Sequence, residues 1–315
     1  MSALPSSPTI SGPPTSGPSL PAWAIEAWHR AQTGTTNYLD LLRAEPERLM
    51  LQCGYQPDPW QVEFLRSEAR TIGCCWSRQT GKSSVAAAMA ILTAVLESPA
   101  LVLLVSKSLR QSSELMRKVK EMYRRISKPA KSVRVFRPKP VKLIDEMELL
   151  PAPYRETVLT MELDNGSRIV CLPGSADTIA CYSAAALIVI DEASRVPDIL
   201  YRTVRPMLAT CGGRLVLIST PFGKRGFFFE VMHGLTPDGR RNPEEWHRIR
   251  IKGLQCPRIP KEFLEDERYS MGLAWYKQEY ECSFEDMEGS LFRHEDIARS
   301  VNPQLKPLYG EEVHV

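Results

Sequence analysis

The sequence predicts an α/β protein with a mostly parallel sheet flanked by helices and a small helical lid near its C-terminal end. Short apolar runs alternate with helical stretches between residues 71 and 220. Several of these runs are continuously apolar, which is typical of strands covered on both faces. The chain has 315 residues, 43% hydrophobic and 24% charged, so it can bury a sizeable core.

Composition also bounds the domain organisation and the class of protein. Residues 1–20 are rich in Pro, Ser and Gly, and we expect a disordered tail there. We assign 21–256 to the α/β domain, 257–290 to the lid and 291–315 to a linker. A net charge of +3 is too small to indicate a nucleic-acid partner by itself. The eight cysteines form no CxxC pair, and no signal peptide or membrane-spanning run is seen, so we expect free thiols in the cytoplasm and no membrane contact.

The expected elements follow in chain order. TIGCCW (71–76) is a short apolar strand, and the Ala-rich stretch 83–97 is typical of a buried helix. A strand at 100–106 and an amphipathic helix at 109–126 come next. Residues 157–173 suit a hairpin whose Asn165-Gly166 pair favours a type I′ turn. The remaining expectations are two buried strands at 186–193 and 214–220 and helical structure from about 257 to 284.

A phosphate-binding motif lies between the first strand and the Ala-rich helix. The stretch is SRQTGKSS, and we assign it as the nucleotide-binding loop: Ser77, Arg78, Gln79, Thr80, Gly81, Lys82, Ser83 and Ser84. Gly81 allows close approach of the backbone to phosphate, Lys82 reaches the β and γ phosphates, and the Ser83 hydroxyl ligates Mg²⁺. Trp76 stands where such loops usually begin with glycine. The alternative is a chance Gly-Lys-Ser at the start of a helix.

Two adjacent acids follow the buried strand LIVIDE. Asp191 is placed to hold Mg²⁺ through its waters, and Glu192 to orient and deprotonate the attacking water. Two neighbouring carboxylates at the end of an apolar strand are costly unless a cation or ordered water meets them. The alternative is a helix N-terminus, where acidic residues are favoured in any case.

Polar residues at two further places are candidates for contact with the nucleotide. Ser219 and Thr220 end the strand LVLIST, and ligands of parallel sheets bind outside the carboxyl ends of strands. An ordinary strand-ending turn explains them equally well. Gln61, in DPWQVEFLRS, has a donor and an acceptor that can read adenine. The alternative is a polar residue on an amphipathic helix.

Taken as an ordered set, these stretches resemble the ATPase domain of the large terminase subunit, the DNA-packaging motor of tailed bacteriophages. The set is DPWQ, SRQTGKS, LIVIDEAS, LISTPFGKRGFFFEV and WYKQEYECSF, and it runs from about residue 57 to residue 293. The resemblance implies a P-loop NTPase of the ASCE class with a RecA-like fold. In that family the loop commonly departs from the usual consensus and contains an arginine.

The resemblance also implies residue roles and partners. Arg78 corresponds to the family's arginine that acts in cis on the γ-phosphate, a role that suits a planar guanidinium. Lys82 and Glu192 complete the catalytic set, Gln61 contacts adenine, and Ser219 and Thr220 form the coupling motif. The expected ligands are ATP and Mg²⁺. The expected partners are double-stranded DNA, the portal protein, the small terminase subunit and other copies in a ring, in the cytoplasm of a host bacterium.

Two departures from the family pattern stand out. Ala180 and Cys181 occupy the place of an Arg-Gly pair that often precedes the strand LIVIDE in the family, so the family's arginine has no counterpart at these positions. The family's nuclease domain has no counterpart before Val315, and Glu285, Asp286 and Glu288 suit a solvated surface. We therefore expect no nuclease activity from this chain and a separately encoded nuclease subunit as one explanation.

A basic segment is the last signal. It spans residues 117–142 and has two interpretations, contact with a DNA backbone or a solvated helix face followed by a lysine-rich loop. Arg124 and Arg125 are candidate trans-acting fingers. Two rival functions also stay open: a DNA helicase or repair ATPase, separable by strand-separation activity, and a nucleotide-binding prophage remnant without catalysis.

Overall fold

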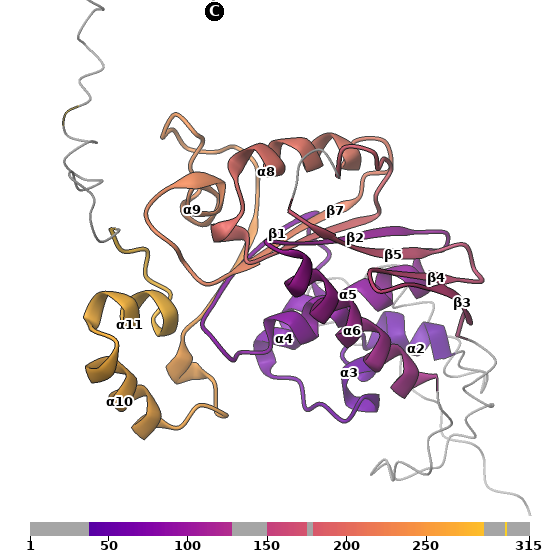
Figure 1. Ribbon diagram of the computed structural model, residues 1–315, viewed down its shortest axis with the longest axis horizontal. Helices are drawn as coiled ribbons and strands as arrows, with labels where there is room; N and C mark the ends of the chain where they lie inside the picture. Colours follow the sequence, from indigo (N-terminus) through magenta and orange to yellow (C-terminus); the bar gives the residue numbers. More distant parts are fainter. Residues whose placement is uncertain (1–37, 128–149, 175–178, 287–299, 301–315) are drawn as a thin grey trace, which may run out of the picture.

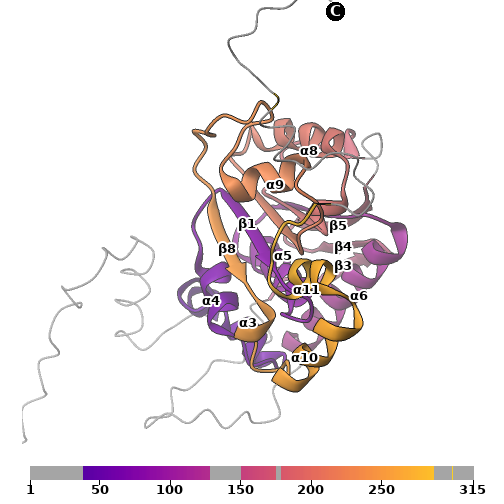
Figure 2. The same cartoon turned by 90° about the vertical axis from the view of Figure 1, so that its left-hand side faces the viewer.

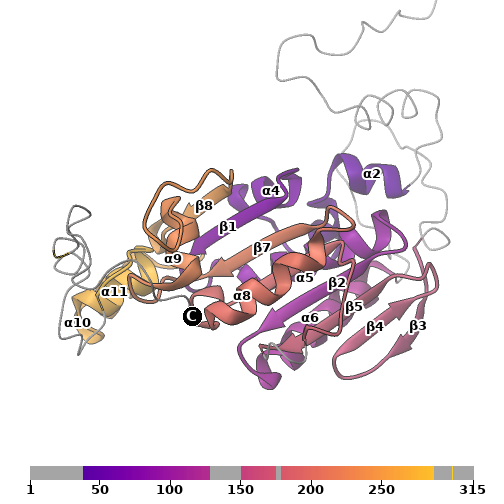
Figure 3. The same cartoon turned by 90° about the horizontal axis from the view of Figure 1, so that it is seen from above.

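The computed structural model describes residues 38–127, 150–174, 179–286 and 300, and it is built around one eight-stranded sheet (Figures 1 and 3). The strand order is β3-β4-β5-β2-β6-β7-β1-β8. All pairs from β5 to β8 are parallel, and β4 runs antiparallel to both of its neighbours. The strands are β1 (Thr71–Trp76), β2 (Leu101–Ser106), β3 (Pro153–Glu156), β4 (Thr160–Leu163), β5 (Arg168–Pro173), β6 (Leu187–Asp191), β7 (Arg214–Ser219) and β8 (His247–Ile251).

Helices cover both faces of this sheet, as Figure 1 shows. One face packs against α2 (Tyr38–Ala44), α3 (Arg48–Gln52), α4 (Pro59–Arg66), α5 (Lys82–Leu96) and α6 (Leu109–Ile126). The other face packs against η1 (Ala193–Arg195), α8 (Asp198–Val204), η2 (Arg205–Leu208) and α9 (Gly226–His233). The predicted fold class, a mostly parallel sheet between helices, is confirmed.

The centre of the sheet shows why continuous apolar runs predict its strands. Every residue of β6 is buried, because helices lie over both of its faces. Helix α5 packs beneath it with an almost unbroken series of small and aliphatic buried side chains from Val85 to Val95. Alanine has the highest helix propensity and a short side chain, so this helix forms readily and approaches the sheet closely.

The C-terminal segment forms a two-helix lid. Its helices are α10 (Lys261–Ser270) and α11 (Leu273–Tyr280), which follow the edge strand β8 and η3 (Gly253–Gln255) (Figure 2). Leu264 is the buried residue of α10, whereas Tyr269 and Trp275 are exposed. The lid therefore buries little apolar surface of its own and depends on the contacts that the end of α11 makes with the sheet.

The hairpin between β4 and β5 forms as expected, but the predicted turn type was wrong. A type I′ turn requires positive φ at both central residues, and only Gly166, with φ of 82°, has it. The amide of Asn165 explains the difference, because it bonds at both ends. Its Nδ2 donates to the Ala94 carbonyl at 2.9 Å, and its Oδ1 accepts from the Ser167 N–H at 2.9 Å. These bonds hold a three-residue loop whose left-handed position falls on glycine.

Some predictions concern residues that the structure does not describe. The tail at 1–20, the segment 128–142 and Glu288 lie outside the described residues. All eight cysteines are described and have free thiols. Among the described residues, no helix has the length and apolar character needed to cross a bilayer.

Candidate active site

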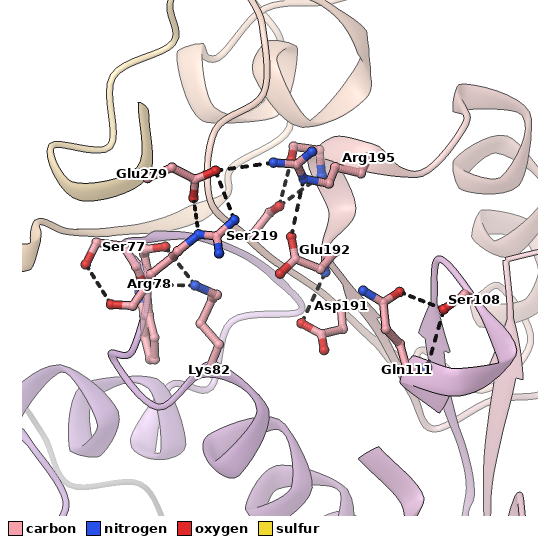
Figure 4. A network of polar contacts seen from close by, with 12 residues as sticks. Ser77, Arg78, Lys82, Ser108, Gln111, Asp191, Glu192, Arg195, Ser219 and Glu279 are labelled. Carbon is pink, nitrogen blue, oxygen red and sulfur yellow. Dashed lines mark hydrogen bonds and ion pairs between the residues drawn. The ribbon is translucent and has the colours of Figure 1, made fainter. Parts of the chain in front are cut away.

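The candidate site lies at the edge of the sheet where the parallel strands end. Strand register places Cys75 beside Ser219 and Asp191 beside Ile218, so β1, β6 and β7 finish at the same level. The loop after β1, the acids after β6 and the hydroxyls after β7 are therefore neighbours in space (Figure 4). This is the crevice where open α/β sheets bind ligands.

The loop after β1 has the backbone of a phosphate cradle. Gly81, with φ of 86°, caps α5 in the left-handed region, and Gln79 also has a positive φ of 60°. A Cβ on Gly81 would lie 2.2 Å from the amide nitrogen of Gln61, so no larger residue fits without movement. Ser83 and Ser84 are half-buried in the first turn of α5, and the buried hydroxyl of Thr80 donates to the Ser77 carbonyl at 2.8 Å.

Lys82 points back along this loop. Its Nζ donates to the carbonyls of Trp76 at 3.2 Å and Ser77 at 2.8 Å, as Figure 4 shows. Burial lowers the pKa of Lys82, and the nearby carboxylates of Glu192 and Asp191 act against that effect. A half-buried ammonium held by two neutral carbonyls gains from an anion, so this geometry favours a bound phosphate.

Asp191 is the acidic counterpart of Lys82. Its carboxyl is buried, and burial together with the neighbouring Glu192 raises its pKa to about 6, although Lys82 opposes the rise. Its Oδ1 accepts the backbone N–H of Glu192 at 3.1 Å. A carboxyl with a raised pKa is a group whose charged form is poorly compensated, and a cation relieves that deficit.

Glu192 has an unusual backbone. Its φ of 54° and ψ of 40° place it in the left-handed region, where a residue other than glycine stores strain. Such outliers occur preferentially at functional sites. One Glu192 carboxylate oxygen lies 3.9 Å from Nε of Arg195, which is in the turn immediately after the strand.

The lid reaches this site through Glu279. Arg78 donates from Nε to Oε2 of Glu279 at 2.8 Å and from Nη2 to Oε1 at 3.4 Å. Arg195 donates to the same Oε1 at 3.3 Å (Figure 4). The Glu279 side chain is only 3% exposed, whereas that of Arg78 is 59% exposed. One buried carboxylate on α11 thus joins the loop arginine to the turn after the acidic strand.

Ser219 is buried and contacts the same turn. Its hydroxyl accepts the backbone N–H of Ser194 at 3.2 Å and lies 2.8 Å from the Ser194 hydroxyl. Thr220 is buried next to it. Strand β7 is therefore tied to the turn that carries Glu192 and Arg195.

Gln61 lies beneath the loop with both ends of its amide bonded. Its Nε2 donates to the Thr80 carbonyl at 3.1 Å, and its Oε1 accepts the Asp58 N–H at 2.9 Å. Asp58 in turn pairs with Arg258 at 2.7 Å. Gln61 supports the loop in this arrangement, and its contact with adenine stays a prediction.

Comparison with known proteins decides the family. The model of the family "Terminase large subunit, T4likevirus-type, N-terminal" matches residues 74–299, more than half of the chain. This protein belongs to that family. The sequence prediction of a large terminase subunit, part of a DNA-packaging motor, is thereby confirmed.

Solved structures agree on the fold. The large terminase ATPase domain of Thermus phage P74-26 superposes with a TM-score of 0.56 at 19% identity, covering 76% of this chain and 98% of that one. A large terminase from a thermophilic bacteriophage gives a TM-score of 0.52 at 13% identity, covering 73% of this chain. The match spans only 53% of that second protein, about half of its length. No curated protein sequence matches the chain.

The other residues that the sequence analysis singled out do not take part in the contacts described above. Four of the six basic residues of α6 have acidic partners: Arg117 pairs with Glu114, Arg125 with Glu121, and Lys120 and Arg124 with Glu156 of β3. Ala180 and Cys181 are both exposed. Asp286 pairs with Lys224 at 3.0 Å, and the described residues contain no cluster of three or more metal-ligating side chains.

The sequence analysis missed Glu279 and Arg195 as site residues. Glu279 falls in WYKQEYECSF, a stretch that contributes to the family resemblance, but nothing in its local pattern separates it from the neighbouring acids. Arg195 follows Glu192 closely in the chain, which was the available signal.

Proposed function

We propose that this terminase subunit hydrolyses ATP with Mg²⁺ and uses the energy to move double-stranded DNA into a procapsid. One observation carries the proposal: Lys82, Asp191 and Glu192 come from distant parts of the chain and meet at the mouth of a glycine-capped loop. Each has the charge that phosphoryl transfer requires at that place.

The loop binds the phosphates of ATP in this proposal. The N–H groups at the start of α5 and the turn at Gly81 donate to phosphate oxygens. Lys82 exchanges its two carbonyl partners for the β and γ phosphates, an ionic partner that suits a buried ammonium better. The negative charge of the phosphates thereby offsets the effect of burial, which lowers the pKa of Lys82.

The donor set around Asp191 fits Mg²⁺. A buried carboxyl with a raised pKa and a hydroxyl at Ser83 are hard oxygen ligands, which this ion prefers. A bound Mg²⁺ would supply positive charge against the negative charge that develops on the phosphate oxygens. Asp191 would hold it through water, and Ser83 directly.

Glu192 acts as the base that orients and deprotonates the attacking water. Its strained backbone and the hydrogen bond from its N–H to Asp191 fix the start of its side chain. Arg195 lies on one side of the carboxylate and holds it only loosely, at 3.9 Å. A water bound to Glu192 can then approach the γ-phosphate from the open side.

Arg78 cannot serve Glu279 and the γ-phosphate with the same donors. Its Nε and Nη2 both bond Glu279, so only its remaining N–H groups can reach a phosphate while the pair stays closed, and use of the whole guanidinium fork requires the pair to separate. Separation removes the side-chain tie between α11 and the loop, while the backbone N–H of Arg78 still donates to the Glu279 carbonyl at 3.2 Å and Arg195 retains its own bond to Glu279. Exchange of Arg78 between the lid and the nucleotide would therefore convert hydrolysis into lid movement.

The expected partners follow from this role. They are double-stranded DNA, the portal protein, the small terminase subunit and neighbouring copies of this chain in a ring on the portal. Family membership supports the group as a whole.

Glu192→Gln tests the proposal most directly. It preserves size and polarity but removes the base, so ATP with Mg²⁺ should bind normally while turnover falls at least about a hundredfold. Release of phosphate and equilibrium binding of a fluorescent ATP analogue measure the two properties. Glu281→Gln, a half-buried acid after α11, is the control and should turn over normally. Wild-type turnover in Glu192→Gln, or no hydrolysis by the unmodified protein, contradicts the proposal.

A further inference from the structure

A second pocket lies at the same edge of the sheet, on the side of α8 and α9. It has a volume of about 370 Å³. Its walls come from the segments after three strands: Lys107 after β2, Ser194, Arg195 and Asp198 after β6, and Phe222 and Arg225 after β7. None of these residues belongs to the predicted nucleotide loop.

The charge of this pocket is strongly positive for its size. Its lining contains three cations, Lys107, Arg195 and Arg225, and one carboxylate, that of Asp198, and Arg195 also pairs with Glu192 and Glu279 outside the lining. Asp198 is already engaged, because its Oδ1 accepts the backbone N–H of Phe227 at 3.1 Å at the start of α9. Lys107 and Arg225 are exposed, and neither forms an ion pair within the described part of the chain. The pocket thus contains cations whose charge no described neighbour balances.

Arg195 is the fixed member of the set. Its guanidinium stacks on the ring of Phe222 at 4.2 Å, while Nη2 bonds Glu279 at 3.3 Å. The stacking and the bond hold the group in place, and no described residue bonds its Nη1. A planar guanidinium held in this way is preorganised to donate to an oxyanion.

We propose that this pocket binds a phosphate group, either a phosphodiester of the DNA backbone or an orthophosphate ion. Lys107 and Arg225 supply mobile charge, and Arg195 supplies an oriented donor. The bound anion touches the same arginine that contacts Glu192 and Glu279. Occupancy is therefore communicated to the hydrolytic carboxylate and to the lid through one side chain. The DNA source rests on the proposed function, whereas the orthophosphate source does not.

The test compares two double variants that remove the same charge. Lys107→Gln/Arg225→Gln alters the pocket, and Arg155→Gln/Arg241→Gln removes two exposed arginines outside it. With the loop saturated by a non-hydrolysable ATP analogue, one arm titrates a duplex of about 20 bp by anisotropy at several salt concentrations. The other arm titrates orthophosphate by phosphorus NMR. Thermal melting and affinity for the analogue show that both variants remain folded.

If the ligand is a phosphodiester, the pocket variant should bind duplex about tenfold or more weakly than the control variant at about 0.1 M salt. The slope of its log affinity against log salt concentration should also become shallower by about 2, one for each lost contact with a phosphate. If the ligand is orthophosphate, only the phosphate arm should weaken, by about tenfold. Equal behaviour of the two double variants in both arms overturns the proposal. ATP turnover by the unmodified protein, measured separately, shows whether the proposed function itself fails.

Discussion

The sheet and the lid are held by different forces, and the candidate site lies where they meet. Helix α5 is buried along nearly its whole length, and β6 is buried throughout. Helix α10 buries Leu264, and α11 buries a short polar-rich series at its end, Gln278, Glu279 and Tyr280. Hydrophobic burial fixes the sheet, whereas an ion-paired carboxylate contributes much of the lid's attachment to the loop.

In the proposed function, this difference lets the sheet stay rigid during hydrolysis while the lid moves. Segments with few buried apolar contacts open at low free-energy cost, independently of the core. Lys82 and Asp191 belong to the sheet and its loop, and Glu279 belongs to the lid. Arg78 lies in the loop and bonds Glu279 of the lid, so its side chain links the two parts.

The largest expected effect lies on the rigid side. Lys82→Ala should abolish ATP hydrolysis, because it removes the buried positive charge that faces the β and γ phosphates. Release of phosphate by the purified protein measures it, with Lys261→Ala, an exposed lid lysine, as the control. Normal turnover in Lys82→Ala would remove the loop from the site.

The next largest effect should come from Arg78, which links the loop to the lid. Arg78→Ala should depress turnover by on the order of 10³ or more while changing ATP affinity far less, as for arginines that act in the transition state. Arg78→Lys should rescue poorly, since a point charge cannot replace a planar fork. Values of kcat and nucleotide Kd for both variants decide the matter. Near-normal kcat in Arg78→Lys would leave only the salt bridge to Glu279 as the role of Arg78.

Replacement of Asp191 should show how much the buried carboxylate of this residue lowers the stability of the folded protein. The pKa of Asp191 is raised from 3.8 to about 6, so the folded state binds the proton more tightly than the unfolded state does. The contribution of Asp191 to the free energy of unfolding therefore falls as pH rises from about 4 to about 6. The loss is roughly 3 kcal/mol above pH 6. Asp191→Asn should therefore be more stable than the unmodified protein at about pH 8, without Mg²⁺ or nucleotide.

Denaturant unfolding at about pH 8 and about pH 4.5 measures this difference, which should shrink at the lower pH. The sign is opposite to that of an ordinary ion-paired carboxylate, which loses stability as pH falls. An Asn variant that is less stable at the higher pH would show that Asp191 supports the fold.

The smallest effect should be confined to the mobile part. Glu279→Gln removes the charge that holds both Arg78 and Arg195, so α10 and α11 should open more often. Hydrogen exchange of residues 261–280 should accelerate about tenfold while that of α5 stays unchanged. Glu281→Gln is the matched control. Equal acceleration across the sheet would mean that Glu279 stabilises the whole fold.

The accuracy of the sequence analysis also differs between parts of the molecule. Helix α6 was predicted with its observed bounds, and so was β1, because hydrophobic periodicity and propensity act over a few neighbouring residues. The edge strands β3 and β8 and the helices α8 and α9 were not predicted. β3 is exposed along its length, and β8 alternates half-buried or exposed residues with buried ones, so neither is the continuous apolar run that marked the central strands.

The sequence by itself determined the pieces of the site: a strand, a glycine-capped loop and a helix in succession, and two acids after an apolar strand. These pieces are local, and backbone hydrogen bonding and burial of small apolar side chains specify each one nearly alone. Only the tertiary structure decided that Arg78 pairs with Glu279, 201 positions away, and that Gln61 supports the loop from below. Ion pairs depend on distance and on the local dielectric, and packing of the lid on the sheet sets both.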